Sequence, residues 1–189
     1  MPSQDPQVLP PGLPVPPDDG GADHLTGMRV PDLELDSSRG RFQLQAHCRV
    51  RAVVYVYPRT GRPGVPSPPG WDAIPGARGC TPQSCAFRDH AGELAGLGAR
   101  VAGLSAQSLD EQVEFAEREG MPYPVVADPG LRLRDALGLP VFEVAGRTLY
   151  KRLTFVAEGG RITKVFYPVF PPDRNAREVL KHLAGPLPC

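Results

Sequence analysis

The order of apolar and polar residues predicts a series of β-strands from residue 33 onward. The segment 33–47, LELDSSRGRFQLQAH, alternates apolar and polar positions around Ser-Arg-Gly, as in a short hairpin. The segment 51–58, RAVVYVYP, is a β-branched and aromatic run that ends at Pro58, which is typical of a strand in the middle of a sheet. Further strands are expected at 99–106, 123–128, 152–158 and 161–169, the last two joined by a tight turn at Gly159-Gly160.

A helix is predicted to begin at Thr81, just after the cysteine at position 80. Thr81 is a suitable N-cap residue, and Pro82 suits the first helical position. Phe87, Ala91 and Leu94 then share one face of the helix at the i, i+4 and i+7 positions.

Three more helices are expected further along the chain. The segment 109–119 has an apolar stripe, formed by Leu109, Val113 and Ala116. A short helix over 130–138 ends at Gly138, and Asp173 is placed to cap a last helix over 177–184.

This order of strands and helices predicts a thioredoxin-like α/β fold, with a mixed central sheet flanked by helices and an N-terminal hairpin. Strand–helix–strand units favour a parallel centre, and the late hairpin adds antiparallel strands. We expect one domain over residues 28–189, preceded by a proline-rich arm over 1–27. Seven prolines lie among the first 24 residues.

The connection 59–79 is expected to be a Pro/Gly-rich insertion before the helix, because five of its residues are proline and five are glycine. It also contains Trp71, the only tryptophan of the chain. Such a long connection is either an anchored surface loop or a wall of the active site.

Charge and composition exclude several classes of protein. Acidic and basic side chains balance at 21 each, and no basic cluster points to nucleic acid or to an anionic membrane surface. No apolar run approaches the roughly 18 residues that a membrane span needs. The first residues lack the basic and apolar regions of a secretory signal, so we expect a cytoplasmic protein. Thiols there stay reduced, so a close cysteine pair favours a catalytic, redox-sensing or metal-binding role over a structural disulfide.

Cys80 and Cys85 form such a pair, in the segment GARGCTPQSCAFRD at 76–89. Cys80 lies at the predicted helix start, where free backbone N–H groups and the helix dipole stabilise a thiolate, the nucleophilic form. In one regular helix the two Cα atoms would lie roughly 8–9 Å apart, whereas a disulfide needs about 4.4–6.8 Å. A bond between them would require the helix start to unwind, as in a two-state switch.

Three other roles fit the same pair. The two cysteines could be unrelated helix residues, a structural disulfide, or metal ligands together with His90. The spacing C-x4-C-x4-H is not a usual zinc pattern and would need two more ligands, so we predict no metal and no other cofactor. Cys48 is most simply a small core residue. Cys189 could join a disulfide or be incidental.

Five segments, in the same order, resemble the peroxiredoxin family in its PrxQ or bacterioferritin-comigratory branch, over roughly residues 28–183. They are VPDLEL (30–35), VVYVYP (53–58), GCTPQSCAFRD (79–89), GMPYPVVADP (120–129) and RLTFVAEGGRI (152–162).

The resemblance implies a thiol peroxidase for hydrogen peroxide, organic hydroperoxides or both. Cys80 would attack the peroxide as a thiolate and become a sulfenic acid, and Cys85 would resolve it through a Cys80–Cys85 disulfide. Arg152 would stabilise the thiolate and polarise the peroxide. The implied reductant is a thioredoxin-like dithiol, and we expect a monomer or weak homodimer.

The chain departs from the family motif P-x-x-x-T/S-x-x-C. Positions −7 and −3 from Cys80 are Ala73 and Ala77, and Pro58 lies 22 residues before Cys80. The insertion therefore falls inside the motif, and the hydroxyl that would bond to peroxide and thiolate has no assigned residue. It could be replaced by Thr60, Asp72, Trp71 or a backbone N–H.

Two other functions remain open. A thioredoxin-like disulfide oxidoreductase would use the same fold, although its C-x-x-C spacing is absent. A non-enzymatic thiol redox sensor would react with peroxide through the same cysteines and pass the oxidation to a partner.

Overall fold

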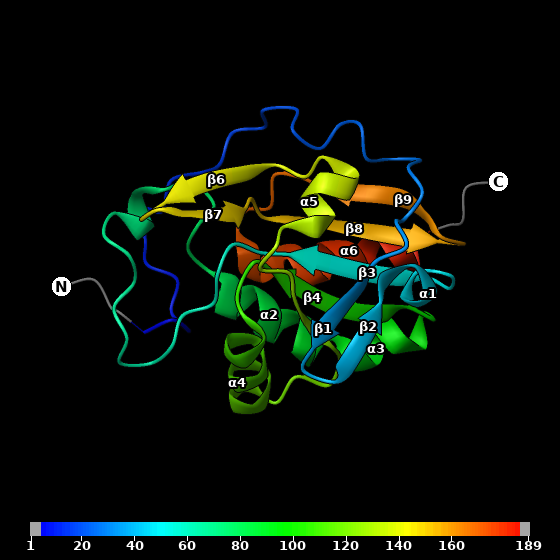
Figure 1. Cartoon of the computed structure of the whole chain (residues 1–189), viewed down its shortest axis with the longest axis horizontal. Helices are drawn as coiled ribbons and strands as arrows, with labels where there is room; N and C mark the ends of the chain where they lie inside the picture. Colours follow the sequence, from blue (N-terminus) through cyan, green and yellow to red (C-terminus); the bar gives the residue numbers. More distant parts are fainter. Residues whose placement is uncertain (1–4, 186–189) are drawn as a thin grey trace.

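The computed structural model describes residues 5–185 and contains a seven-stranded mixed sheet (Figure 1). Its strands are β1 (Glu34–Ser37), β2 (Gly40–Gln43), β3 (Ala52–Val56), β4 (Arg100–Ser105), β5 (Val125–Ala127), β8 (Leu153–Glu158) and β9 (Arg161–Phe166). Their order across the sheet is β2-β1-β5-β4-β3-β8-β9. The pairs β3–β4 and β4–β5 are parallel, and the other pairs are antiparallel.

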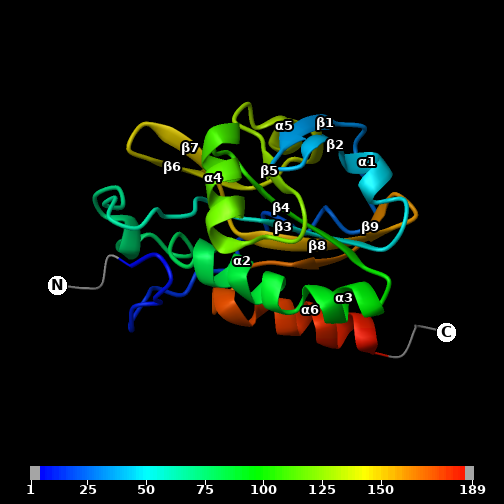
Figure 2. The ribbon, with the colours of Figure 1, turned by 90° about the horizontal axis from the view of Figure 1, so that it is seen from below.

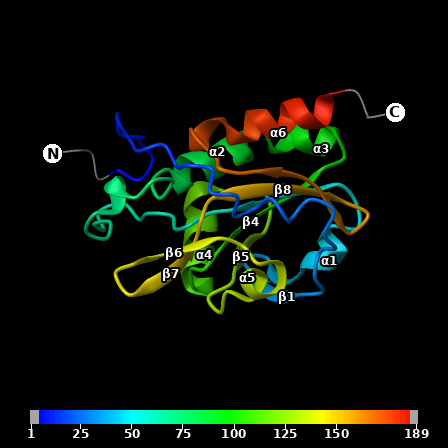
Figure 3. The same cartoon turned by 90° about the horizontal axis from the view of Figure 1, so that it is seen from above.

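The helices lie in layers on the two faces of this sheet. They are α1 (Leu44–His47), α2 (Cys80–Asp89), α3 (Ala91–Gly96), α4 (Leu109–Glu119), α5 (Arg132–Leu137) and α6 (Asn175–Ala184), with short 3-10 turns η1 (Trp71–Ala73) and η2 (Pro172–Arg174). Apolar side chains of α2, α3, α4 and α6 form one core, and those of α1 and α5 belong to the core on the other face. Figures 2 and 3 both show α2, α3 and α6 side by side.

Strand β3 lies inside the sheet and determines where the site forms. All five of its residues are buried, and they pair with β4 on one side and β8 on the other. Its side chains alternate between the two cores, with Val53 and Tyr55 facing α2. The chain leaves the carboxyl end of β3 and, after the insertion, enters α2. This end of the sheet is where α/β folds place their sites.

The predicted thioredoxin-like α/β fold, mixed sheet and N-terminal hairpin are confirmed by this architecture. One hairpin was not predicted: β6 (Val141–Val144) and β7 (Arg147–Tyr150) form a separate two-stranded sheet. Its turn is Ala145-Gly146, with Ala145 at a positive φ of 48°. Ala-Gly is a weak turn signal because alanine rarely adopts that conformation.

Three details of the helices differ from the sequence prediction. Thr81 is not an N-cap, because α2 begins one residue earlier with Gly79 as its N-cap residue. The expected single helix through Leu94 is two helices, separated at His90. Asp173 does not cap α6; it lies in η2, which runs directly into α6.

The buried face of α4 also differs from the predicted stripe. Leu109 is 37% exposed, whereas the buried residues are Gln112, Phe115, Ala116 and Glu119. Of the predicted stripe, Ala116 is buried as expected; Gln112 and Glu119 are polar, so a pattern of apolar residues could not find them.

The segment before β1 contacts the body at separate points, although most of its residues are exposed or half-buried. Leu25 is fully buried in the core, and the backbone N–H of Gly27 donates to the carbonyl of Ile162 at 2.8 Å. Nearer the N-terminus, Pro6 and Pro16 approach the insertion at Gly61 and Gly76. Across the described part of the chain, no helix has both the length and the apolar character to cross a membrane.

Candidate functional site

The insertion ends in a tight approach between Gly79 and η2 that fixes the start of α2. Gly79 has a φ of 99°, in the left-handed region that favours glycine. A Cβ at this position would lie 2.4 Å from Pro172 Cγ and 2.7 Å from Leu9 Cδ2. The absence of a side chain therefore lets the helix begin directly against η2, with Cys80 as its first residue.

Two hydrogen-bond donors converge on the sulfur of Cys80. The Arg152 guanidinium donates through Nη2 at 3.2 Å, and the backbone N–H of Arg59 donates at 3.4 Å. The side chain is 2% exposed. As the first residue of α2, Cys80 also lies at the positive end of a helix dipole. Donors and dipole both favour a sulfur that carries negative charge.

Arg152 is 3% exposed, and backbone carbonyls hold it in place. Its Nη2 donates to the carbonyl oxygens of Gly76, Ala77 and Arg78 at 3.1, 3.2 and 3.0 Å. Its Nη1 donates to the side chain of Gln83. Among the described residues, no carboxylate forms an ion pair with this guanidinium. Its positive charge is therefore available to Cys80 and to an anion beside it.

A buried polar chain supports the guanidinium from the side of α6. Gln83 Nε2 donates to Asn175 Oδ1 at 3.1 Å, and Thr154 Oγ1 donates to the same oxygen at 2.6 Å. All three residues are fully buried. These hydrogen bonds fix the rotamer of Gln83 and thereby the position of Arg152.

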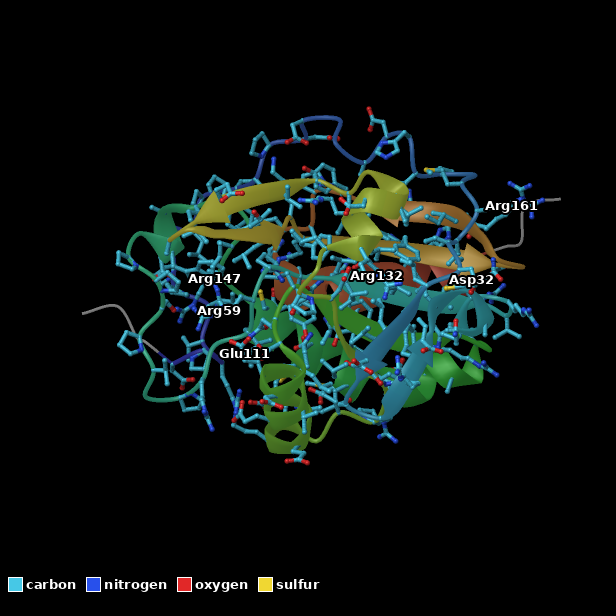
Figure 4. All side chains as sticks on the ribbon, in the orientation of Figure 1. Asp32, Arg59, Glu111, Arg132, Arg147 and Arg161 are labelled. Atoms are coloured by element: carbon cyan, nitrogen blue, oxygen red, sulfur yellow. The ribbon has the colours of Figure 1, made fainter. Side chains whose placement is uncertain are left out.

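Cys80 opens into a small pocket at this end of the molecule. The pocket has a volume of about 20 Å³, enough for a water-sized molecule. Its walls come from the residues after β3, from the insertion, from the start of α2 and from the arm: Pro6, Arg59, Thr60, Gly61, Ser67, Pro68, Trp71, Arg78, Gly79, Cys80 and Thr81. The insertion therefore forms a wall of the pocket. Figure 4 shows Arg59, Glu111 and Arg147 at this end.

The candidates for the missing motif hydroxyl lie at different places. Thr60 lines the pocket, but its hydroxyl donates to Gln107 Oε1 at 3.0 Å, as does its backbone N–H at 2.8 Å. Asp72 pairs with Arg78 at 3.4 Å. The backbone N–H that reaches the sulfur belongs to Arg59. Thr81, which the sequence suggested as an N-cap and not as the source of this hydroxyl, lines the pocket with a buried hydroxyl that has no hydrogen-bond partner among the described residues.

Cys85 lies further along α2 in a different environment. It is half-buried, and its thiol donates to Glu119 Oε2 at 3.6 Å. Burial, with a smaller contribution from the Glu119 carboxylate, raises the pKa of Cys85 to about 11. Two N–H donors therefore point at the Cys80 sulfur, which itself donates to the carbonyl of Ala77 at 3.5 Å, whereas the Cys85 thiol has only the carboxylate acceptor as a hydrogen-bond partner among the described residues. Both are free thiols in this structure.

Cys48 and His90 have other surroundings than this pair. Cys48 is fully buried in the core on the other face, and burial raises its pKa to about 12. Cys189 lies outside the described residues. His90 contacts Glu93 at 2.6 Å. Within residues 5–185, no group of three or more metal-ligating side chains comes together.

The arm reaches the site through contacts that the sequence did not predict. Arg78 Nη2 donates to the carbonyl oxygen of Asp5 at 2.8 Å, and Gln7 Nε2 lies 3.3 and 3.4 Å from the Glu119 carboxylate oxygens. Pro6, between them, forms part of the pocket wall. These contacts join residues more than 70 positions apart, so no local pattern could reveal them.

Known proteins resemble this chain over most of its length. The Redoxin family pattern matches residues 25–180. A chloroplastic peroxiredoxin Q from Sedum lineare is 31% identical over 83% of this chain and 76% of its own length. One from Gentiana triflora is 32% identical over 69% of this chain, so the match spans about half, 53%, of that relative. The crystal structure of peroxidoxin BcpB from Mycobacterium tuberculosis superposes with a TM-score of 0.68 at 28% identity, covering 85% of this chain and 97% of that one.

Proposed function

The chain belongs to the redoxin family, in its peroxiredoxin Q branch, and from this membership we propose that it is a thiol peroxidase that reduces hydroperoxides with Cys80 as the attacking group. The observation that carries this proposal is the contact of 3.2 Å between Arg152 and the Cys80 sulfur at the floor of a solvent-linked pocket.

In the first step, the Cys80 thiolate attacks one oxygen of the peroxide and the O–O bond breaks. The other oxygen leaves with the bonding electron pair and takes a proton to become water or an alcohol, and Cys80 becomes a sulfenic acid. Negative charge develops on the leaving oxygen. Arg152 and the Arg59 backbone N–H are placed to stabilise this charge, because both already point at the sulfur.

In the second step, the Cys85 thiol condenses with the Cys80 sulfenic acid, forming the disulfide and releasing water. Both cysteines lie on α2, so its first turns must unwind for the sulfurs to meet. A thioredoxin-like dithiol would then reduce the disulfide by thiol exchange, itself becoming oxidised.

The size of the pocket bears on the substrate. A space for one water-sized molecule accepts hydrogen peroxide or the terminal oxygens of a larger hydroperoxide. We propose hydrogen peroxide as the best substrate for the structure as it stands, with bulkier hydroperoxides requiring movement of the arm or insertion.

Peroxide consumption in the presence of a thioredoxin system tests this function. Wild type should turn over repeatedly, Cys80→Ser should be inactive, and Cys85→Ser should react once and leave a sulfenic acid that a dimedone probe traps. Full turnover by Cys80→Ser would refute the assignment. Oxidation without recycling would instead support a redox sensor.

Location and assembly are part of the same proposal. We propose a cytoplasmic monomer or weak homodimer; the curated relatives named above are chloroplastic proteins by name. Fractionation of cells that express the tagged chain and light scattering of the purified chain test the two points.

A further inference from the structure

Glu119 is a buried carboxylate next to the second cysteine. It is the last residue of α4, and its side chain is 5% exposed. Two arginines compensate the buried charge: Arg118, in direct contact, and Arg88 of α2, at 3.7 Å. Arg88 also donates to the backbone carbonyl of Glu119 at 2.8 Å. The carboxylate is thus held in place from two helices.

The same carboxylate connects three parts of the molecule. Its Oε2 accepts the Cys85 thiol of α2 at 3.6 Å, and both oxygens face Gln7 of the arm. The Cys85 sulfur, which must move when the disulfide forms, is therefore held by a carboxylate that also contacts the N-terminal arm.

We propose, resting on the function proposed above, that Glu119 is a positioning residue that holds Cys85 as a thiol in the wound helix and so limits the rate at which Cys85 resolves the Cys80 sulfenic acid. The resolving step is Cys85–SH plus Cys80–SOH giving a disulfide and water, with the thiol proton ending in that water. Cys85 must leave Glu119 and lose its proton before its sulfur can attack.

The charges around Cys85 support this role. Glu119 and Asp89 disfavour a thiolate at this position, whereas Arg88 favours it. The buried hydroxyls of Tyr55 and Tyr123 face the same region. Because burial and Glu119 both raise the pKa of Cys85, the thiolate fraction at neutral pH is small. Glu119 thereby keeps the second cysteine from reacting until α2 opens.

Single-turnover fluorescence tests the proposal, since Trp71 is the only tryptophan and lines the Cys80 pocket. We expect Glu119→Gln to accelerate the disulfide-forming phase severalfold at about pH 7.5, because the Cys85 thiol loses a carboxylate acceptor that raises its pKa. The pH profile of that phase should move to lower pH. The control Glu117→Gln removes an exposed carboxylate from the same helix and should match wild type.

A slower phase in Glu119→Gln, or a rate and pH profile equal to those of wild type, would overturn the proposal. A second measurement needs no peroxide and no Glu119 variant. In Cys80→Ser protein, the pH dependence of Cys85 alkylation by iodoacetamide, followed by mass spectrometry, should show a pKa well above the ordinary value for a thiol. An ordinary value would overturn the role of Glu119 even if peroxide fails to react. Absence of the first, oxidation phase in wild type speaks only against the proposed function.

Discussion

The Arg152 guanidinium lies 3.2 Å from the Cys80 sulfur, although the two residues are 72 positions apart in the chain. Strands β3 and β8 pair side by side, so the start of β8 lies next to the end of β3, where α2 begins. The sheet register thus brings the two groups together, and the carbonyls of residues 76–78 hold the guanidinium within hydrogen-bond distance of the sulfur.

Replacing Arg152 by lysine should slow the reaction with peroxide about 100-fold, the order seen when a transition-state donor is lost. A lysine retains the charge but cannot donate to the carbonyls and to the sulfur together. Stopped-flow oxidation monitored through Trp71 measures the rate. Arg174→Lys, a matched change at an exposed residue of η2, should leave it unaltered. An Arg152→Lys rate within twofold of wild type would contradict the role.

Two threonines in the pocket should behave differently when each is changed to valine. Thr81 has a buried hydroxyl without a partner among the described residues, so Thr81→Val should lower the second-order rate constant with hydrogen peroxide about 10-fold, as expected for one lost hydrogen bond. Thr60→Val should mainly lower stability, by about 1 kcal/mol, because its hydroxyl donates to Gln107. If Thr60→Val instead lowered the rate constant with hydrogen peroxide more than Thr81→Val, Thr60 would be the residue whose hydroxyl replaces that of the family motif.

Removing the start of the arm should widen access to Cys80. A chain that begins at residue 10 lacks Pro6 and the contacts of Asp5 and Gln7 with Arg78 and Glu119. The ratio of kcat/KM for a bulky aryl hydroperoxide to that for hydrogen peroxide should rise severalfold, because one pocket wall is gone. A chain that begins at residue 5 serves as the control. An unchanged ratio would show that Pro6 does not restrict the substrate.

His47 should make the fold sensitive to acid. Burial, and to a smaller extent the positive charge of Arg100, lower its pKa from 6.5 to about 4. The unfolded chain therefore binds a proton that the folded chain does not, and the free energy of unfolding should fall between about pH 6.5 and pH 4, by at most roughly 3 kcal/mol. Urea unfolding at pH 7 and pH 4.5 measures the loss. His47→Phe should lose less stability over this interval, and an equal loss would exclude His47 as the cause.

The sheet and most helices could be predicted because their sequences are locally consistent. The β-branched and aromatic run at 51–58 predicts an inner strand and no other element. Ser108 and Glu111 form a capping box at the start of α4. The hairpin β6–β7 has no such signal, since its turn depends on an alanine at positive φ. The buried face of α4 contains Gln112 and Glu119, whose burial depends on distant partners.

The site was predictable to a similar degree. A local motif placed Cys80 and Cys85 on one helix, and a resemblance singled out Arg152, which the structure brings to the Cys80 sulfur. The groups that surround these three residues could not be predicted from the sequence. Gln83, the Arg59 N–H and Glu119 act through contacts between segments 21 to 69 positions apart, and neither their residue types nor their spacing marks them.

Both ends of the Pro/Gly-rich segment 59–79 are tied to the reacting groups. Its first N–H donates to the sulfur, and its last carbonyls accept from the guanidinium. A change of length or composition between these two anchor points would therefore alter the pocket wall first, and would reach the sulfur and the guanidinium only through the two ends.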